Sequence, residues 1–113
     1  MPNESNRTPT VVGRRMRSRR EELGWPQEKV GVAIGLDESS ARARISRYEL
    51  GVHEPPYETV KLLAEVLRVP VTYMYCDDEI IAQLLLMLDG LPVTARATAI
   101  ARLMAEARPA SPG

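Results

Sequence analysis

The sequence predicts an all-α protein, because three observations agree on helices. Apolar residues recur at every third or fourth position along most of the chain, as they do on one face of a helix. Glycine and proline separate these segments at intervals typical of short helices. No run of β-branched residues alternates as it would in a half-buried strand. With 113 residues, 44 % of them hydrophobic and none of them Phe, the chain has room for one compact domain with an aliphatic core, plus an appendage.

Glycine and proline delimit the first two predicted helices. The first ends at Gly24, and the residues that recur on its inward face are Val12, Met16, Arg20 and Leu23. The second is short, because Pro26 begins it and Gly35 ends it. Its predicted inward residues are Val30, Ala33 and Ile34.

The third predicted helix has an N-cap at Asp37 and stops at Gly51. The run HEPP that follows cannot be helical, because two prolines lie in it. A fourth helix is therefore expected over about Tyr57–Arg68, and Pro70 then begins a short turn with the sequence VTYMY.

Two more helices are expected in the last third of the chain. Acidic residues at 77–79 suit the N-terminus of the first, and the second covers about Val93–Ala107 after a break at Gly90 and Pro92. Leu86 and Met87 add apolar surface on another side of the first of these helices, and we expect this excess to be buried between two copies of the chain. The main apolar stripe is broader than one short helix needs and consists of Ile80, Ile81, Leu84, Leu85 and Leu88, with Ile100, Leu103 and Met104 on the last helix.

Composition argues against several classes of function. Cys76 and His53 are the single cysteine and the single histidine, so the sequence predicts no internal disulfide, no metal site and no cofactor. No Ser/His/Asp arrangement, Walker loop or Gly-rich dinucleotide turn is present, and we therefore expect no enzymatic activity. The longest apolar runs fall short of a membrane span, and the N-terminal residues do not resemble a signal peptide. A cytoplasmic location without membrane contact is expected.

Positive charge is concentrated near the N-terminus although the net charge is zero. Residues 1–53 carry 10 Lys/Arg against 7 Asp/Glu, whereas residues 54–113 carry 5 against 8. Six arginines and no acidic residue lie between Arg7 and Arg20. Arginine is the better partner for phosphates and guanine edges, but a solvated, Arg-rich helix face gives the same pattern.

The second and third predicted helices are the most informative segment. A helical wheel places Ala41, Ile45, Tyr48 and Glu49 on one side of the third helix. Small and basic residues lie opposite, with Arg42 and Arg44 on the flanks, and this outward group comprises Ser39, Ser40, Ala43, Ser46 and Arg47. Short side chains let a helix enter a major groove about 12 Å wide, where hydroxyls and arginines contact base edges. A Ser/Arg-rich surface helix of an ordinary bundle remains the alternative.

Three motifs extend this pattern to most of the chain. They are GRRMRSRREELGWPQEKVGVAIG, ARISRYELG and ETVKLLAEVLRVPVTYMYC. Over about residues 11–76 the sequence resembles the Cro and phage-repressor type of helix-turn-helix, the xenobiotic-response-element (XRE) family. The resemblance implies a five-helix, lambda-repressor-like DNA-binding domain, usually dimeric, that acts as a transcriptional regulator.

The resemblance also implies roles for individual residues. Gln27 matches a glutamine that touches the DNA backbone, and Arg20 and Glu49 match a structural pair that joins the first and third helices. The positions that face DNA in the family correspond to Arg42, Ala43, Arg44 and Arg47. The expected phosphate contacts are Arg14, Arg15 and, in the loop after the third helix, His53.

One departure from the family lies between Gly35 and Ile45, where LDESSARAR adds about four residues. Four residues are close to one helical turn, so an N-terminal extension of the third helix would nearly preserve its phase. Ser39 and Ser40 thereby become further candidates for DNA contact. Arg42 then either contacts bases or holds phosphate.

We expect a DNA-binding domain at residues 9–76, a helical hairpin at 77–107 that dimerises through the apolar stripe, and flexible tails at 1–8 and 108–113. The favoured function is a transcriptional regulator, in particular a repressor, that binds double-stranded DNA as a homodimer on a palindromic operator. The alternative is an antitoxin-like protein that masks a partner such as a toxin and regulates its own operon.

Overall fold

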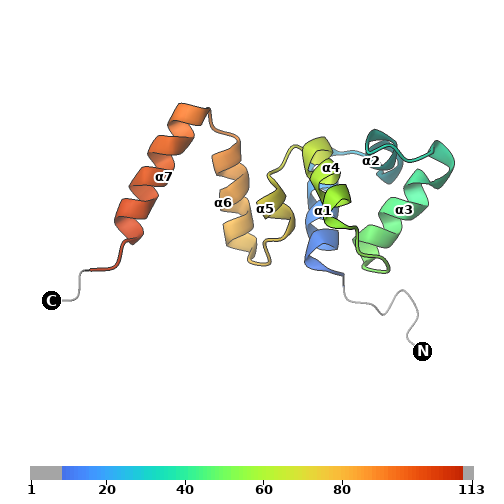
Figure 1. The fold of residues 1–113 in the computed structure, drawn as a ribbon, viewed down its shortest axis with the longest axis horizontal. Helices are drawn as coiled ribbons and strands as arrows, with labels where there is room; N and C mark the ends of the chain where they lie inside the picture. Colours follow the sequence, from blue (N-terminus) through green and yellow to red (C-terminus); the bar gives the residue numbers. More distant parts are fainter. Residues whose placement is uncertain (1–8, 111–113) are drawn as a thin grey trace.

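The computed structural model describes residues 9–110, and all regular structure in that range is helical (Figure 1). The helices are α1 (Val11–Leu23), α2 (Gln27–Ala33), α3 (Glu38–Leu50), α4 (Tyr57–Leu67), α5 (Val71–Met74), α6 (Glu79–Asp89) and α7 (Val93–Ala107). The all-α prediction is therefore confirmed. Residues 1–8 and 111–113, most of the predicted tails, lie outside the described residues.

Glycine and proline end and begin the helices as the sequence predicts. Gly24 and Gly51 close α1 and α3 in the left-handed conformation, at φ 72° and 78°. The N-caps of α2, α4, α5 and α7 are prolines without a side-chain hydrogen bond, so a preset φ starts these helices. Asp37 lies at the N-cap of α3, but its side chain accepts no capping hydrogen bond.

The core lies between α1, α2, α3, α4 and α5. Four residues that the sequence places on the buried faces of helices are fully buried there, namely Val12, Met16, Val30 and Ile45, and α4 adds Leu63 and Leu67. Ile34 is only partly buried, and Ala33, which was expected to face inward, is exposed because it closes the seven-residue α2 on its outer side. Tyr73 and Met74 of α5 complete the core.

Two glycines allow α3 to approach its neighbours closely. A Cβ on Gly31 of α2 would lie 2.6 Å from the Cβ of Ala41, and one on Gly13 of α1 would lie 2.7 Å from the carbonyl oxygen of Tyr48. Since real side chains do not tolerate such distances, both helix pairs depend on the absence of a side chain. The orientation of α3 is thereby fixed from two sides.

Helices α6 and α7 project from this domain as an arm (Figure 1). Helix α6 docks through buried Ala82 and half-buried Leu86, whereas α7 buries none of its residues. The radius of gyration is 17.0 Å, compared with about 13 Å for a compact chain of this length. Within residues 9–110, no helix combines the length and the apolar character needed to cross a membrane.

The position of Leu86 corrects one expectation. Leu86 was expected among the apolar residues left over for a partner, but it packs against the core of the domain. It lies four residues after Ala82, on the face of α6 that docks. Met87, which was assigned with it, is 70 % exposed.

Candidate nucleic-acid interface

Helix α3 has one buried side and one exposed side. Ala41, Ile45, Tyr48 and Glu49 are buried, as the helical wheel predicts. On the opposite side the candidate residues Ser39, Ser40, Arg42, Ala43, Arg44 and Arg47 are exposed, and Ser46 is half-buried. Thirteen residues give this face a length of about 20 Å.

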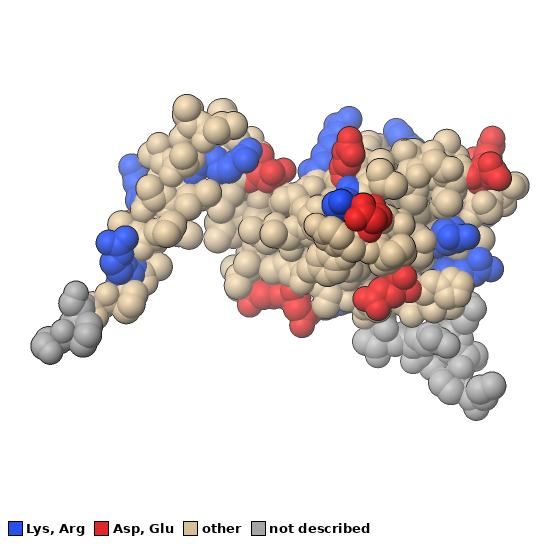
Figure 2. All heavy atoms as spheres, viewed as in Figure 1, with Lys and Arg blue, Asp and Glu red and all other residues tan. Residues whose placement is uncertain are grey.

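The arginines on the exposed side of α3 are available to bind an anion. Among the ion pairs of residues 9–110, none includes Arg42, Arg44 or Arg47. By contrast, the arginines of α1 between positions 14 and 20 all pair with carboxylates. Figure 2 shows basic side chains protruding beside α3, at the right-hand end of the molecule.

The segment between Gly35 and Ile45 contains the first turns of α3. The helix begins at Glu38, so Ser39 and Ser40 lie in its first turn and are exposed. The hydroxyl of Ser40 donates to the carbonyl oxygen of Asp37 at 3.3 Å. Both hydroxyls therefore lie at the tip of α3.

A buried carboxylate joins α1, α2 and α3. Glu49 is 3 % exposed and accepts hydrogen bonds from Arg20 Nε at 2.7 Å and from Arg20 Nη2 at 3.0 Å. The hydrogen bond with Glu49 is the largest cause that raises the pKa of Arg20 above its ordinary value. Gln27 Nε2 also donates to Glu49, at 3.0 Å. The amide of Gln27 is thereby oriented at the first residue of α2.

Gln27 and Arg42 lie close together at the surface. Together with Arg20, Pro26 and Glu28, they line one open hollow between the N-terminus of α2 and α3. A backbone phosphate beside α3 can therefore contact an amide and a guanidinium at once.

Arg14 and His53 occupy the edges of this surface. Arg14 is 44 % exposed and donates to Asp77 Oδ1 at 2.5 Å. It also borders a shallow hollow with Glu49, which places it beside the C-terminal half of α3. His53 is exposed just beyond α3, and its backbone N–H donates to the carbonyl oxygen of Arg47. Ser39 and Ser40 lie at the opposite end of α3.

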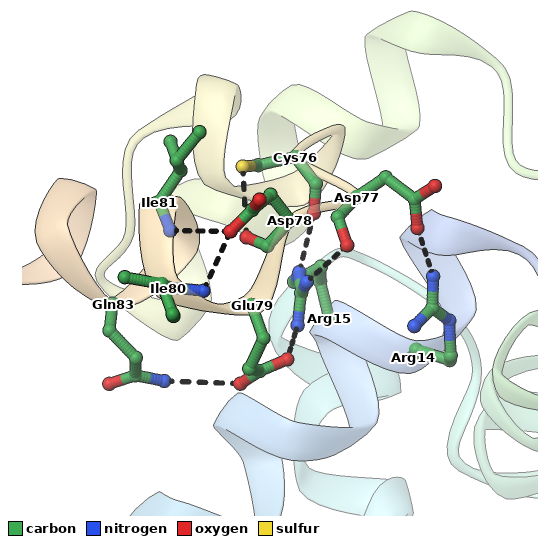
Figure 3. A network of polar contacts seen from close by, with 9 residues as sticks. All are labelled: Arg14, Arg15, Cys76, Asp77, Asp78, Glu79, Ile80, Ile81 and Gln83. Atoms are coloured by element: carbon green, nitrogen blue, oxygen red, sulfur yellow. Dashed lines mark hydrogen bonds and ion pairs between the residues drawn. The ribbon is translucent and has the colours of Figure 1, made fainter.

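The structure contradicts the expected phosphate contact of Arg15. Its side chain is 2 % exposed and lies between α1 and the start of α6 (Figure 3). The guanidinium donates to the carbonyl oxygens of Cys76 and Asp77 and to the carboxylate of Glu79. With its donors engaged inside the protein, Arg15 has no access to a phosphate.

The sequence contained a signal for the true position of Arg15. Arg15 lies three residues after Val12 and next to Met16, so the helical period places it on the buried side of α1. The acidic run at residues 77–79 supplies its partners. Gly13 and Gly31 were also missed as positions of close helix approach, because one sequence does not indicate which glycines pack against a neighbour.

Comparison with known proteins agrees with this geometry. The helix-turn-helix family model matches residues 16–74, about half of the chain. HTH-type transcriptional regulators from Sinorhizobium medicae (strain WSM419) and Rhizobium meliloti (strain 1021) are each 33 % identical over 66 residues, which span 58 % of this chain and 45 % of each relative. The chain thus matches less than half of the length of these relatives.

A solved structure is similar over a larger part of the chain. The crystal structure of the transcriptional regulator BswR matches with a TM-score of 0.77 and 34 % sequence identity, and the alignment covers 83 % of this chain and 92 % of that one. The fold and the α3 surface define a helix-turn-helix protein of the DNA-binding class. The chain belongs to the XRE-type helix-turn-helix family of transcriptional regulators.

Proposed function

We propose that the chain is a repressor that binds a palindromic operator as a homodimer and inserts α3 into the major groove. The exposed side of α3 carries this proposal, because its three arginines pair with no carboxylate among residues 9–110. An exposed guanidinium on a helix of small side chains suits guanine O6 and N7 in the major groove.

The exposed side of α3 supplies two kinds of DNA contact. Arg44 lies in the middle of the helix and Arg47 in its C-terminal part, and both bind base edges. Ala43 offers a methyl group to thymine. Gln27, Arg42 and the hydroxyls of the first turn contact the backbone at the N-terminal end. Arg14 and His53 add phosphate contacts at the other end of α3.

Dimerisation is proposed because α6 is apolar on two opposite faces. The face with Ala82 and Leu86 covers the domain, but Ile80 is 82 % and Ile81 is 51 % exposed on the other side. Helix α7 continues this surface with exposed Ile100, Leu103 and Met104. A helix that is apolar on two opposite faces requires cover on both of them. A second copy provides that cover and places two α3 helices on one duplex.

Repression requires only that the dimer occupy the operator. A dimer of 12.6 kDa protomers bound across promoter DNA excludes polymerase from the same site. A protein partner such as a toxin is the competing occupant of the α6–α7 surface. A chain that is monomeric alone but gains an equimolar partner from its own operon would favour the antitoxin-like function instead.

The test is selection of bound sequences from random duplexes with the full chain. The proposal predicts enrichment of an inverted repeat whose half-sites lie about 10 bp, or a multiple of that, apart. Arg44→Ala and Arg47→Ala should each change or relax the enriched motif, whereas Arg42→Ala should weaken binding without changing it. A pool that stays random after repeated selection would contradict the proposal.

A further inference from the structure

Arg15 is a buried cation that the proposed DNA contacts do not use. Its Nε lies 2.7 Å from the carbonyl oxygen of Cys76, its Nη2 lies 3.2 Å from that of Asp77, and its Nη1 lies 2.6 Å from Glu79 Oε2 (Figure 3). The guanidinium also lies 5.8 Å from the centroid of the Tyr73 ring. One side chain of α1 therefore holds the end of α5, the connecting segment and the first turn of α6.

The same helix is fixed against α3. Gly13, two residues before Arg15, brings the backbone of α1 against the carbonyl oxygens of Tyr48 and Glu49, where a Cβ would lie 2.7–2.8 Å away. Arg20, five residues after Arg15, holds Glu49 with two hydrogen bonds. Helix α1 thus connects α3 on one side to α6 on the other.

We infer that Arg15 is a positioning residue that fixes the orientation of α6 relative to α3 and thereby sets the operator half-site spacing that the dimer prefers. This inference rests on the proposed function, because it requires a dimer built on α6 and α7. Arg15 itself contacts no DNA.

The other contacts between α6 and the domain do not supply this restraint. Ala82 and Leu86 dock through apolar contact, which is not directional. The ion pair between Arg14 and Asp77 is exposed on both sides, and exposed pairs contribute little. The planar guanidinium, by contrast, has a fixed fork of donors and engages three acceptors at once.

Half-site spacing is sensitive to this orientation. One additional base pair moves a half-site by about 3.4 Å along the duplex and rotates it by about 35°. A rigid dimer meets a changed spacing only by deforming DNA, which lowers affinity by about tenfold or more. A dimer whose α6 pivots on the domain can follow the displaced half-site and therefore loses less affinity for DNA.

The test measures the affinity of the full-length dimer for a set of duplexes with the selected half-sites moved apart in steps of one base pair. Wild type should prefer one spacing over its neighbours by about tenfold. Arg15→Met, which keeps the length of the side chain and removes its donors, should reduce that preference to about threefold or less while affinity for one isolated half-site is retained. Arg17→Met is the matched control, because Arg17 is exposed on the same helix and pairs with Glu21 within it.

Sedimentation and thermal unfolding establish that each variant is a folded dimer. If Arg15→Met does not fold, Glu79→Ala is tested in its place. Glu79 is 64 % exposed, so its replacement leaves the core intact, and it removes the anion that Arg15 binds. A folded dimer of either variant that keeps the full preference would overturn the inference alone. A wild-type chain that binds all spacings equally would overturn both the inference and the proposed dimeric operator.

Discussion

At the scale of single residues, Arg47 is the side chain whose removal separates base contact from phosphate contact. It is exposed on α3 and forms no ion pair within residues 9–110. Arg47→Ala should weaken binding to the selected operator by about 1–3 kcal/mol and weaken binding to random duplex much less, because a guanidinium on guanine distinguishes bases. Fluorescence anisotropy with both duplexes measures the two losses. Equal losses would make Arg47 a phosphate contact.

Arg14→Ala should behave differently. Arg14 lies at the edge of the surface and carries charge without reaching the centre of α3. Its loss should weaken binding to the operator and to random duplex by the same factor. It should also lower the slope of log affinity against log salt by about 0.9. A loss confined to the operator would contradict a phosphate contact at this position.

Glu79 gives a prediction about pH. The hydrogen bond from Arg15 is the largest cause that holds the pKa of Glu79 below its ordinary value of 4.5. A lowered pKa in the folded state stabilises the protein above the unfolded-state pKa, and this contribution is lost as the pH falls through the folded-state value. Glu79→Gln should therefore lower the melting temperature at neutral pH, and this difference should disappear as the pH falls through the folded-state pKa of Glu79. A melting difference that is independent of pH would contradict the Arg15–Glu79 pair.

At the scale of elements, the angle between α2 and α3 depends on Gly31. A Cβ at Gly31 would approach Ala41 Cβ to 2.6 Å and its backbone to 2.9 Å. Gly31→Ala should cost about 1–3 kcal/mol of stability through overpacking, and it should weaken DNA binding by rotating α3. Gly90→Ala is the control, because its nearest atom lies 3.5 Å away and its φ is −75°, so it should be neutral or slightly stabilising. Chemical denaturation measures the free energy of unfolding of both variants.

The boundaries of the elements were largely predictable because local rules determine them. Left-handed glycines end α1 and α3, prolines begin four helices, and the helical period identified the buried side of α3. The orientation of α6 was not predictable from the period, since apolar residues occupy most of its circumference and Glu79 and Gln83 form only a narrow polar strip. Leu86 was misplaced for that reason.

The α3 part of the candidate site was predictable from the sequence, but the position of Arg15 was not. Exposure and the position on α3 followed from the helical wheel, so the outward residues lie on the surface as predicted, except for half-buried Ser46. Arg15 was misplaced because charge alone was taken to indicate solvent. Its burial depends on carbonyl and carboxylate partners more than 60 residues away, and such partners are visible only when the fold is known.

At the scale of the whole molecule, the exposed apolar surface of the arm predicts a dimer in solution. Leu103 is 46 % exposed on the apolar face of α7, and Thr98 lies on the opposite, polar face. Leu103→Asp should shift the chain toward monomer at micromolar concentration, because a carboxylate is costly to bury in an apolar interface. Thr98→Asp is the matched control and should leave the dimer intact. Sedimentation velocity distinguishes these states, and a monomeric wild type would contradict the proposed interface.

The salt dependence of duplex binding tests the central claim most directly, namely that α3 and its flanking basic residues bind DNA. The wild-type dimer is titrated onto its selected operator at several salt concentrations. With about five phosphate contacts per protomer, log affinity should fall steeply with log salt, by about 0.9 for each phosphate neutralised. An affinity that does not change between low and moderate salt would contradict the account.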